Sequence, residues 1–363
     1  MIIQLKDLCQ KASSNIAQKD LEGHEGQYPI YGASGLIGYV DFYKQENPYV
    51  AVVKDGAGIG RVMCLPEKSS VIGTMQYILP NEGVNVHYLA FAMEHMNLAK
   101  YFSGATIPHI YFKDYGKEKL LERTEKEQKS IAEILNKMDS LISLRKQQIA
   151  KLDELVKARF VEMFGNIIRN DKSWPIHNFS DIASSRLGKM LDAKQQTGKY
   201  SYPYLANFNV QWFNFNVDNL NQMDFNEAEQ KEFELRDGDL LVCEGGEIGR
   251  CAVWHNEIQP CFFQKALHRV RCNRQLVQPD YLAWWFKYNC NHGGFAEIAG
   301  AKATIAHLPG IKLKQLQVAL PPLSLQNEFA AFVERIDQQK QTVQQSLEKL
   351  ELMKKALMQE YFG

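Results

Sequence analysis

Two stretches of the chain place apolar residues at every seventh position. Residues 124–164 contain no Gly or Pro, and Thr124 and Glu127 have the spacing of a helix capping box. One apolar series there is uninterrupted: Leu135, Ile142, Ile149, Val156 and Met163. From Ser324 onward a similar series runs through Phe329, Ile336, Val343, Leu350 and Leu357. Seven-residue spacing aligns side chains along one stripe of a helix, so the pattern predicts two long coiled-coil helices.

A second apolar series in each stretch is interrupted by basic residues. Arg145 and Arg159 break it in the first stretch, and Lys340 and Lys354 break it in the second. Either helix alone would expose an apolar stripe to water, so we expect the two to pack on each other. A helix of about 38 residues is roughly 57 Å long, and a second helix packed along it must run back. The pattern therefore predicts an antiparallel pair that forms a rod.

The remaining segments alternate short apolar runs with turns. Residues 28–43, 48–65 and 233–254 contain short apolar runs rich in Val, Ile and Tyr, punctuated by Gly and Asp-Gly, which is typical of strands joined by turns. Residues 87–102 and 279–289 have the aromatic faces of packed helices. The sequence therefore predicts compact α+β units between the long helices.

The two halves of the chain repeat each other at an offset of 198 residues. The matched pairs are Thr106 with Thr304, His109 with His307, Gln128 with Gln326, Asp139 with Asp337, Leu152 with Leu350, and Phe164-Gly165 with Phe362-Gly363. We interpret this as a tandem duplication with a pseudo-twofold axis. It predicts four segments: a globular unit at 1–122, a helix at 123–165, a globular unit at 166–320 and a helix at 321–363.

Composition narrows the class of protein. The chain is 45% hydrophobic and 23% charged, which is typical of a globular protein, and no run is long and apolar enough for a membrane span. The start lacks the pattern of a secretion signal, and the seven scattered cysteines form no CxxC pair, so we expect a cytoplasmic protein with reduced thiols. Net charge is zero, which argues mildly against nucleic acid as a ligand.

The sequence carries no recognisable catalytic motif. The string Asn47-Pro48-Tyr49 lacks one proline of the amino-methyltransferase motif, and G-x-S-x-G, HExxH and P-loop strings are absent. We therefore expect a non-enzymatic chain that binds no cofactor or metal of its own.

A glycine-rich turn occurs twice, as VKDGAGIGR at 53–61 and as VCEGGEIGR at 242–250. Its simplest interpretation is a hairpin turn in which Gly supplies positive φ. The functional interpretation is a bare backbone that another molecule approaches, with Lys54, Arg61 and Arg250 beside it. Arginine can grip phosphate or guanine through its planar fork, but it can equally pair with a neighbouring acid.

Two further places hold candidate DNA contacts. The string QKALHRVR at 264–271 predicts a strand with Gln264 and His268 on one face and Lys265 and Arg269 on the other. One face is a candidate for reading bases, although strand charges are often simply solvated. The repeated pairs Thr106 with His109 and Thr304 with His307 either contact DNA from loops or cap local backbone.

Taken together, these motifs resemble the specificity (S) subunits of type I restriction-modification systems, across the whole chain and in their repeat order. The resemblance implies two target-recognition domains that each read half of a bipartite, asymmetric site in double-stranded DNA. It implies that the helices set the gap and dock two methyltransferase (M) subunits, with restriction (R) subunits in the full complex. S-adenosylmethionine, ATP and Mg are then expected on the partner subunits.

Two other interpretations stay open at this point. A specificity subunit of a type IIB system, in which one partner chain both methylates and cleaves, has a similar architecture. A pseudo-symmetric coiled-coil scaffold that binds only proteins belongs to a different class. Salt-dependent, sequence-specific DNA binding by the reconstituted complex would exclude the scaffold.

Overall fold

The chain divides into two compact units. The computed structural model describes residues 1–104, 108–192, 196–296 and 307–363. Unit 1 comprises residues 1–148 with 343–363, and unit 2 comprises residues 149–342. Each long helix is therefore divided between the units, whereas the sequence predicted four consecutive segments. The division arises because the two ends of each helix are buried in different cores.

Unit 1 is built from nine short strands and several short helices among its described residues. The strands are β1 (Ile2–Gln4), β2 (Cys9–Ser13), β3 (Tyr28–Gly32), β4 (Gly35–Val40), β5 (Tyr49–Val53), β6 (Val62–Leu65), β7 (Ser70–Val71), β8 (Met75–Pro80) and β9 (Lys119–Leu121). The helices are α1 (Leu5–Leu8), η1 (Gln18–Leu21), α2 (Val86–His95), η2 (Leu98–Tyr101) and α3 (Phe112–Tyr115). The sheets have the orders β2-β8-β5-β6, β4-β3-β7 and β1-β9.

Unit 2 repeats this plan. Its strands are β10 (Ile176–Asn178), β11 (Ala183–Leu187), β12 (Ser201–Leu205), β13 (Val210–Gln211), β14 (Asn214–Phe215), β15 (Asn221–Asp224), β16 (Leu240–Cys243), β17 (Cys251–Val253), β18 (Phe262–Phe263), β19 (Leu267–Cys272) and β20 (Gln317–Ala319). Its helices are α5 (Phe179–Ile182), η4 (Asn207–Asn209), α6 (Glu227–Phe233), α7 (Pro279–Asn291) and α9 (Gly310–Lys314).

The sheets of the two units match strand for strand. Unit 2 has the orders β11-β19-β16-β17, β15-β12-β18 and β10-β20, and the only parallel pairs in the described ladders, β3 with β7 and β12 with β18, occupy equivalent places. The small β13-β14 hairpin and α6 are additions of unit 2. The tandem repeat and the α+β class predicted from the sequence are thus confirmed.

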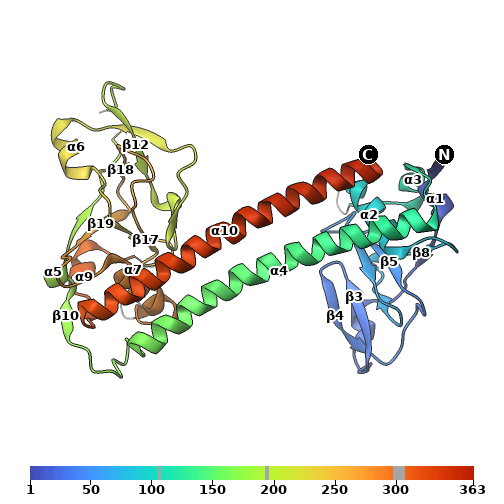
Figure 1. Cartoon of the computed structure of the whole chain (residues 1–363), viewed down its shortest axis with the longest axis horizontal. Coiled ribbons are helices and arrows are strands. Elements are labelled where there is room, and N and C mark those ends of the chain that lie inside the picture. The colour runs from blue at the N-terminus through green and yellow to red at the C-terminus, as the bar shows by residue number, and fades with distance from the viewer. Residues whose placement is uncertain (105–107, 193–195, 297–306) are drawn as a thin grey trace. The chain divides into compact units, whose positions relative to one another are not determined.

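The central strand of each unit is buried on both faces, which explains its continuous apolar sequence. In β5, Val50 and Val52 face the core beneath α2, while Tyr49, Ala51 and Val53 face the opposite core. In β16 the same alternation divides Leu240 and Val242 from Leu241 and Cys243. Figure 1 shows α2 lying across the sheet that contains β5. The four-stranded sheet of each unit is therefore covered by helices on one face and by the three-stranded sheet of the same unit on the other face.

The predicted helix at 87–102 is shorter in the structure. Helix α2 ends at His95, and Asn97 takes a left-handed backbone with φ of 48°. That conformation cannot continue a right-handed helix, so the chain turns into the short helix η2.

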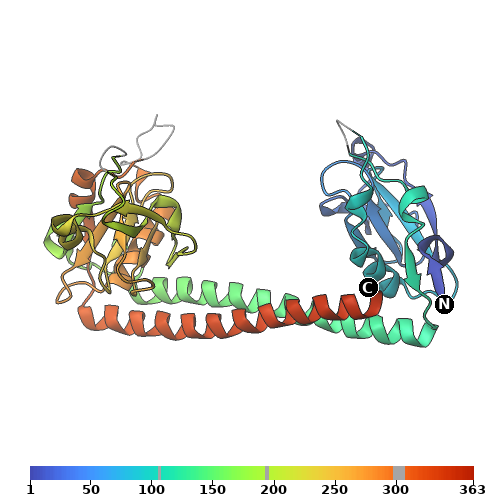
Figure 2. The ribbon, with the colours of Figure 1, turned by 90° about the horizontal axis from the view of Figure 1, so that it is seen from above.

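The long helices α4 (Glu125–Phe164) and α10 (Leu323–Phe362) each contain 40 residues. The predicted capping box starts α4, with the Glu127 N–H donating to Thr124 Oγ1 at 3.3 Å and the Thr124 N–H donating to the Glu127 carboxylate at 2.8 Å. In each unit a stretch of α4 lies beside a stretch of α10 (Figure 1 and Figure 2). All nine stripe residues that the sequence marked for helix packing or partner binding are buried or half-buried.

Ion pairs show that the helices are antiparallel within each unit. In unit 1, Lys354 pairs with Asp139 at 2.7 Å and Glu351 pairs with Lys146 at 2.9 Å. In unit 2, Lys340 pairs with Asp153 at 2.6 Å and Glu328 pairs with Arg159 at 2.8 Å. Three of the four basic residues that interrupt the second apolar series thus pair across the helices. Exposed pairs of this kind contribute at most about 1 kcal/mol each, so their main effect is on helix register.

The C-terminal end of α4 packs in the core of unit 2, and the C-terminal end of α10 packs in the core of unit 1. Phe164, at the end of α4, packs against Tyr281 in unit 2 with ring centroids 4.8 Å apart. Phe362, at the end of α10, packs against Tyr88 in unit 1 at 5.3 Å. These two phenylalanines are a matched pair of the repeat, so each core is completed by a helix that follows the other globular segment.

A buried glutamine repeats the same junction in both units. Gln128 Oε1 accepts the Asn85 N–H at 3.0 Å at the start of α2, and its amide donates to the Arg123 carbonyl at 3.0 Å. Gln326 binds Gln278 at the start of α7 at 2.9 Å and the Pro321 carbonyl at 2.7 Å. The glutamine ties the first turn of each long helix to the start of the helix that covers the sheet.

Candidate nucleic-acid interface

Each glycine turn closes a hairpin at the end of the central strand. In unit 1 the Val53 N–H donates to the Arg61 carbonyl at 2.9 Å, and in unit 2 the Cys243 N–H donates to the Arg250 carbonyl at 2.8 Å. A Cβ on Gly60 would lie 2.4 Å from the Ala99 nitrogen, so that glycine is required by close packing. Gly56 and Gly246 have φ of 81° and 80° and open space around them. The turns are therefore structural hairpins, and each leaves open space at one glycine, Gly56 or Gly246.

The two turns differ in length by one residue. The ladder places Val53 opposite Met75 in unit 1 and Cys243 opposite Leu267 in unit 2, so Val53 and Cys243 are equivalent. Aligning the two glycine-rich strings, 53–61 with 242–250, pairs Val53 with Val242 instead. The arginines still coincide, because unit 2 has one residue fewer between strand and arginine.

Both arginines bind the same place in their units. Arg61 Nη1 donates to the Ala33 carbonyl at 2.7 Å, and Arg250 Nη2 donates to the Asn207 carbonyl at 3.0 Å. Ala33 and Asn207 are equivalent because each lies two residues after a matched position of the parallel ladder, Tyr31 in β3 or Leu205 in β12. Arg250 also donates to Asn207 Oδ1 at 2.7 Å. Neither arginine forms an ion pair among the described residues, so the simple salt-bridge interpretation does not hold for them.

In unit 1 the glycine turn carries a charged cluster. Lys54 Nζ lies 2.6 Å from Asp55 Oδ2, and His109 Nδ1 lies 2.6 Å from Asp55 Oδ1. Burial alone would raise the pKa of Asp55, but the hydrogen bonds from Lys54 and His109 outweigh it and hold that pKa below its usual range. The carboxylate therefore offsets the charge of Lys54 and orients the His109 ring.

In unit 2 the matching histidine has a different neighbour. Gly245 stands where unit 1 has Asp55, and the His307 ring would be 3.1 Å from a Cβ at Gly245. His307 is exposed and forms a backbone bridge with Gly245. The two other predicted contacts of this group, Thr106 and Thr304, lie outside the described residues.

The prediction of a DNA-reading strand at 264–271 is partly wrong. Gln264 and Lys265 belong to a turn, because Ala266 has φ of 84° and β19 begins only at Leu267. His268 is 1% exposed, and its Nε2 donates to the Leu308 carbonyl at 3.0 Å. Neither His268 nor Arg269 can reach DNA in this fold. Lys265 remains exposed and Gln264 half-exposed.

Arg269 shows why a charge in this strand faces inward. It is 8% exposed and donates to the Glu232 carbonyl at 2.6 Å, with its guanidinium over the Phe263 ring at 5.3 Å. Burial lowers the pKa of Arg269 to about 10, so it stays charged near neutral pH. Its donors organise the backbone before β16 and are not presented to solvent.

Backbone hydrogen bonds join four segments of unit 2 into one edge. Lys265 donates to the Lys189 carbonyl at 2.8 Å, and Glu244 donates to the Ala266 carbonyl at 2.9 Å. Leu308 donates to the Glu244 carbonyl at 2.6 Å. The end of β11, the 264–266 turn, the glycine turn and the segment at His307 are thereby held side by side.

Unit 1 uses the same three backbone bonds with other residues. Gly73 donates to the Ile16 carbonyl at 2.7 Å, Lys54 donates to the Thr74 carbonyl at 3.0 Å, and Ile110 donates to the Lys54 carbonyl at 3.0 Å. The two units therefore present one backbone scaffold with different side chains on it.

Sequence reasoning missed Asn207 and Lys189. Asn207 donates to the Gly245 carbonyl at 3.0 Å while it accepts from Arg250, so it ties both sides of the glycine turn. Lys189 forms an ion pair with Glu229 at 2.6 Å. Both side chains act on partners 35 or more residues away, and neither carries a local sequence pattern that marks it.

All seven cysteines are free thiols, and within the described ranges no group of three His, Cys, Asp or Glu side chains is placed to hold a metal ion. No described helix is both long enough and apolar enough to cross a membrane.

Solved structures of type I restriction-modification proteins have a similar fold. One is the S subunit from M. genitalium, with a TM-score of 0.66 and 15% identity over 100% of this chain and 96% of that one. Another comes from a study of complex assembly and conformational transition of the type I system, with a TM-score of 0.59, 12% identity, and 99% and 97% coverage. At these identities the likeness establishes the fold alone.

Sequence comparisons extend the likeness to the family. A putative type I restriction enzyme specificity subunit of Methanocaldococcus jannaschii is 23% identical over 195 residues, or 53% of this chain, and the match spans about half (46%) of that relative. One from Haemophilus influenzae is 22% identical over 333 residues, or 86% of this chain and 80% of the relative. The family profile described as "Type I restriction modification DNA specificity domain" matches residues 1–154 and 171–352. The chain therefore belongs to the type I restriction-modification DNA specificity family.

Proposed function

We propose that this chain is the DNA sequence-specificity subunit of a type I restriction-modification complex, and that each unit reads one half of a bipartite, asymmetric site. The observation that supports this most is the repeated backbone edge with different side chains. Unit 1 presents Lys54, Asp55 and His109 there, whereas unit 2 presents Gly245 and His307. Sequence is read by hydrogen bonds to base edges, so one scaffold with two sets of side chains suits two different half-sites.

The partners follow from the same proposal. Two methyltransferase subunits dock on the paired helices and carry S-adenosylmethionine, and restriction subunits bring ATP and Mg. The chain itself is non-catalytic and cytoplasmic in this proposal. Because its net charge is zero, much of the phosphate contact falls to the partners, and the chain alone binds DNA weakly.

The complex with purified methyltransferase should have one copy of this chain and two of the partner by native mass measurement. It should bind double-stranded DNA sequence-specifically, with an affinity that falls as salt rises. A one-to-one complex that persists in excess partner contradicts the docking proposal. Absence of DNA binding by the full complex indicates the scaffold, and a partner chain that both methylates and cleaves indicates a type IIB system.

The arginines of the glycine turns should act on separate half-sites. Arg61→Ala is expected to relax recognition of one half and Arg250→Ala the other, at a cost of about 1–3 kcal/mol for a lost base contact. The expected effect of Arg61→Ala is the cleaner one, because Arg61 is exposed and only its Nη1 is engaged, whereas Arg250 also supports Asn207. The methylation of DNA sites that carry one mismatch in either half-site measures the effect of each variant. If neither variant changes site choice while both stay folded, the arginines are structural.

A further inference from the structure

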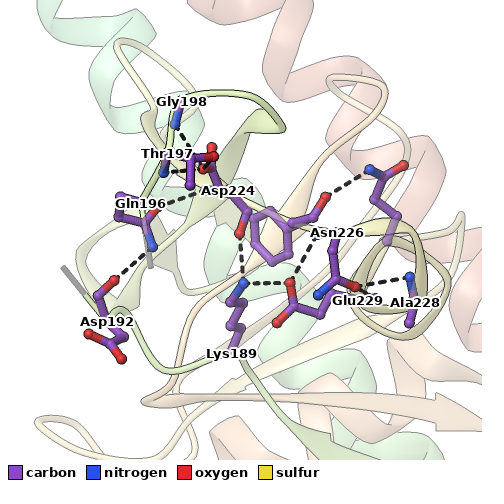
Figure 3. Close-up of polar contacts among 11 residues, drawn as sticks. Lys189, Asp192, Gln196, Thr197, Gly198, Asp224, Asn226, Ala228 and Glu229 are labelled. Atoms are coloured by element: carbon purple, nitrogen blue, oxygen red, sulfur yellow. Dashed lines mark hydrogen bonds and ion pairs between the residues drawn. The ribbon is translucent and has the colours of Figure 1, made fainter. Parts of the chain in front are cut away.

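Lys189 follows β11 and is held by an unusually complete set of partners. Its ammonium donates to the Asp224 carbonyl at 2.7 Å and to Glu229 Oε2 at 2.6 Å (Figure 3). The ammonium also lies 5.1 Å from the centroid of the Phe225 ring. The side chain is 11% exposed. A charge this far from water is tolerated only when it is paired and hydrogen-bonded, so these contacts fix its position.

The backbone of Lys189 is tied to the turn that carries Lys265. Its N–H donates to the Phe263 carbonyl at 3.2 Å, and its carbonyl accepts the Lys265 N–H. Immediately before it, a Cβ on Gly188 would lie 2.2 Å from the Gln264 carbonyl oxygen, so only glycine permits this approach. Lys189 therefore links the exposed Lys265 turn to the end of β15 and the first turn of α6.

The Asp224 side chain holds two further described residues, Thr197 and Gly198. Asp224 Oδ2 accepts from the Thr197 N–H at 2.5 Å, from Thr197 Oγ1 at 2.7 Å and from the Gly198 N–H at 2.8 Å (Figure 3). The Thr197 hydroxyl and the two N–H groups hold the pKa of Asp224 below its usual range, so it stays ionised at neutral pH. Lys189 and Gly198 are thus both anchored on the Asp224–Glu229 region.

Unit 1 serves as an internal control for this arrangement. There Ile16 and Gly73 form the same backbone bond as Lys189 and Lys265. Ile16 packs beside a small apolar cluster of Ile30, Val40 and Ile72. The charged anchor and the exposed cation on the turn therefore belong to unit 2 alone, on a backbone that both units share.

We propose that Lys189 is a positioning residue for DNA reading by unit 2. Lys189 holds the turn at 264–266 in place, and the exposed ammonium of Lys265 on that turn contacts DNA. The bond from the Glu244 N–H to the Ala266 carbonyl keeps this turn beside the glycine turn. This rests on the proposed function and deepens it. The sequence fidelity of one half-site then depends on an ion pair that does not itself touch DNA, and the other half-site is independent of it.

The test compares methylomes of hosts that carry the full complex with wild-type chain or with Lys189→Met, Lys189→Arg or Lys265→Met. For Lys189→Met we expect methylation at sites with one mismatch in the unit 2 half, identified as the half relaxed by Arg250→Ala, to rise by roughly tenfold. Mismatches in the other half should stay excluded. Lys189→Arg should restore fidelity because it keeps a cation at the same place. Lys265→Met should alter one base of the motif if it reads a base, or lower methylation uniformly and reduce the salt slope if it binds phosphate.

Glu232→Gln is the matched control, because Glu232 lies on the same helix, α6, and forms an ion pair with the exposed Arg186. It should leave both half-sites as in the wild type. If the Lys189→Met chain loses hydrogen-exchange protection in β16, the Glu229→Gln variant is used in its place. Glutamine can still accept the Asn226 N–H that caps α6, but it removes the negative charge beside Lys189. A folded Lys189→Met or Glu229→Gln chain with wild-type fidelity, or equal relaxation of both halves, overturns the inference. A wild-type complex without a bipartite motif instead overturns the proposed function.

Discussion

Replacing Phe164 with alanine should strongly destabilise unit 2 and leave the stability of unit 1 unchanged. Phe164 is fully buried, with ring centroids 4.8 Å from Tyr281 and 5.3 Å from Phe329. Removing a buried phenyl ring costs about 3–5 kcal/mol, because both its transfer free energy and the contacts around the cavity are lost. That is a large part of the roughly 5–15 kcal/mol that stabilises a typical domain. Amide hydrogen exchange in β16 measures the stability of unit 2, and exchange in β5 measures that of unit 1.

Phe362→Ala is the matched variant, because Phe362 is the repeat partner of Phe164 and packs on Tyr88 in unit 1. Its ring is only half-buried, so we expect a smaller loss, confined to β5 and its neighbours. Val161→Ala, on an exposed part of α4, should leave both units protected. Equal loss of protection in both units with Phe164→Ala would contradict the assignment of each helix end to one core.

Lengthening both long helices by one heptad should widen the gap between half-sites and leave the half-sites themselves unchanged. The insertions belong after Gln148 in α4 and after Thr342 in α10, where the packing divides each helix between units. Seven residues lengthen a helix by about 10.5 Å at 1.5 Å per residue. DNA rises about 3.4 Å per base pair, so under the proposed function the gap should grow by about three base pairs. Methylome sequencing of the variant gives both the gap and the half-sites.

A whole heptad is used because it keeps every apolar stripe facing its partner helix. The control inserts seven residues into α4 alone, which forces the ion pairs Asp139–Lys354 and Asp153–Lys340 out of step with each other. We expect that chain to lose activity. A paired insertion that stays active with the original gap, or that changes a half-site, contradicts the proposal that the helices set the spacing.

The parts of the fold that follow from regular periodicity were predictable from the sequence. Heptad spacing located both long helices, and the polar breaks at Lys340 and Lys354 became antiparallel ion pairs. The 198-residue match between Gln128 and Gln326 became a repeated junction with the same bonds. These features can be read from the sequence because heptad spacing is a property of one helix, and because a duplicated contact leaves the same residue at both positions of the repeat.

The candidate interface was less predictable because burial is a tertiary property. Alternation along 267–271 holds in β19, but it does not tell whether both faces of the sheet are covered. Both are, so His268 and Arg269 serve the interior. The positive φ of Ala266 could not be predicted either, because alanine rarely adopts a left-handed backbone. Only the turn between Lys265 and β19 requires that conformation. Lys189 was missed because Glu229 is 40 residues away.

The most direct test of the central claim is methylome sequencing of a host that carries this chain with its methyltransferase. We expect one motif made of two short, different half-sites separated by a gap of fixed length in which any base is accepted. Each half should respond to only one of the two glycine-turn arginines. A single continuous motif, a motif that both Arg61→Ala and Arg250→Ala relax in the same half, or the absence of any sequence preference would contradict it.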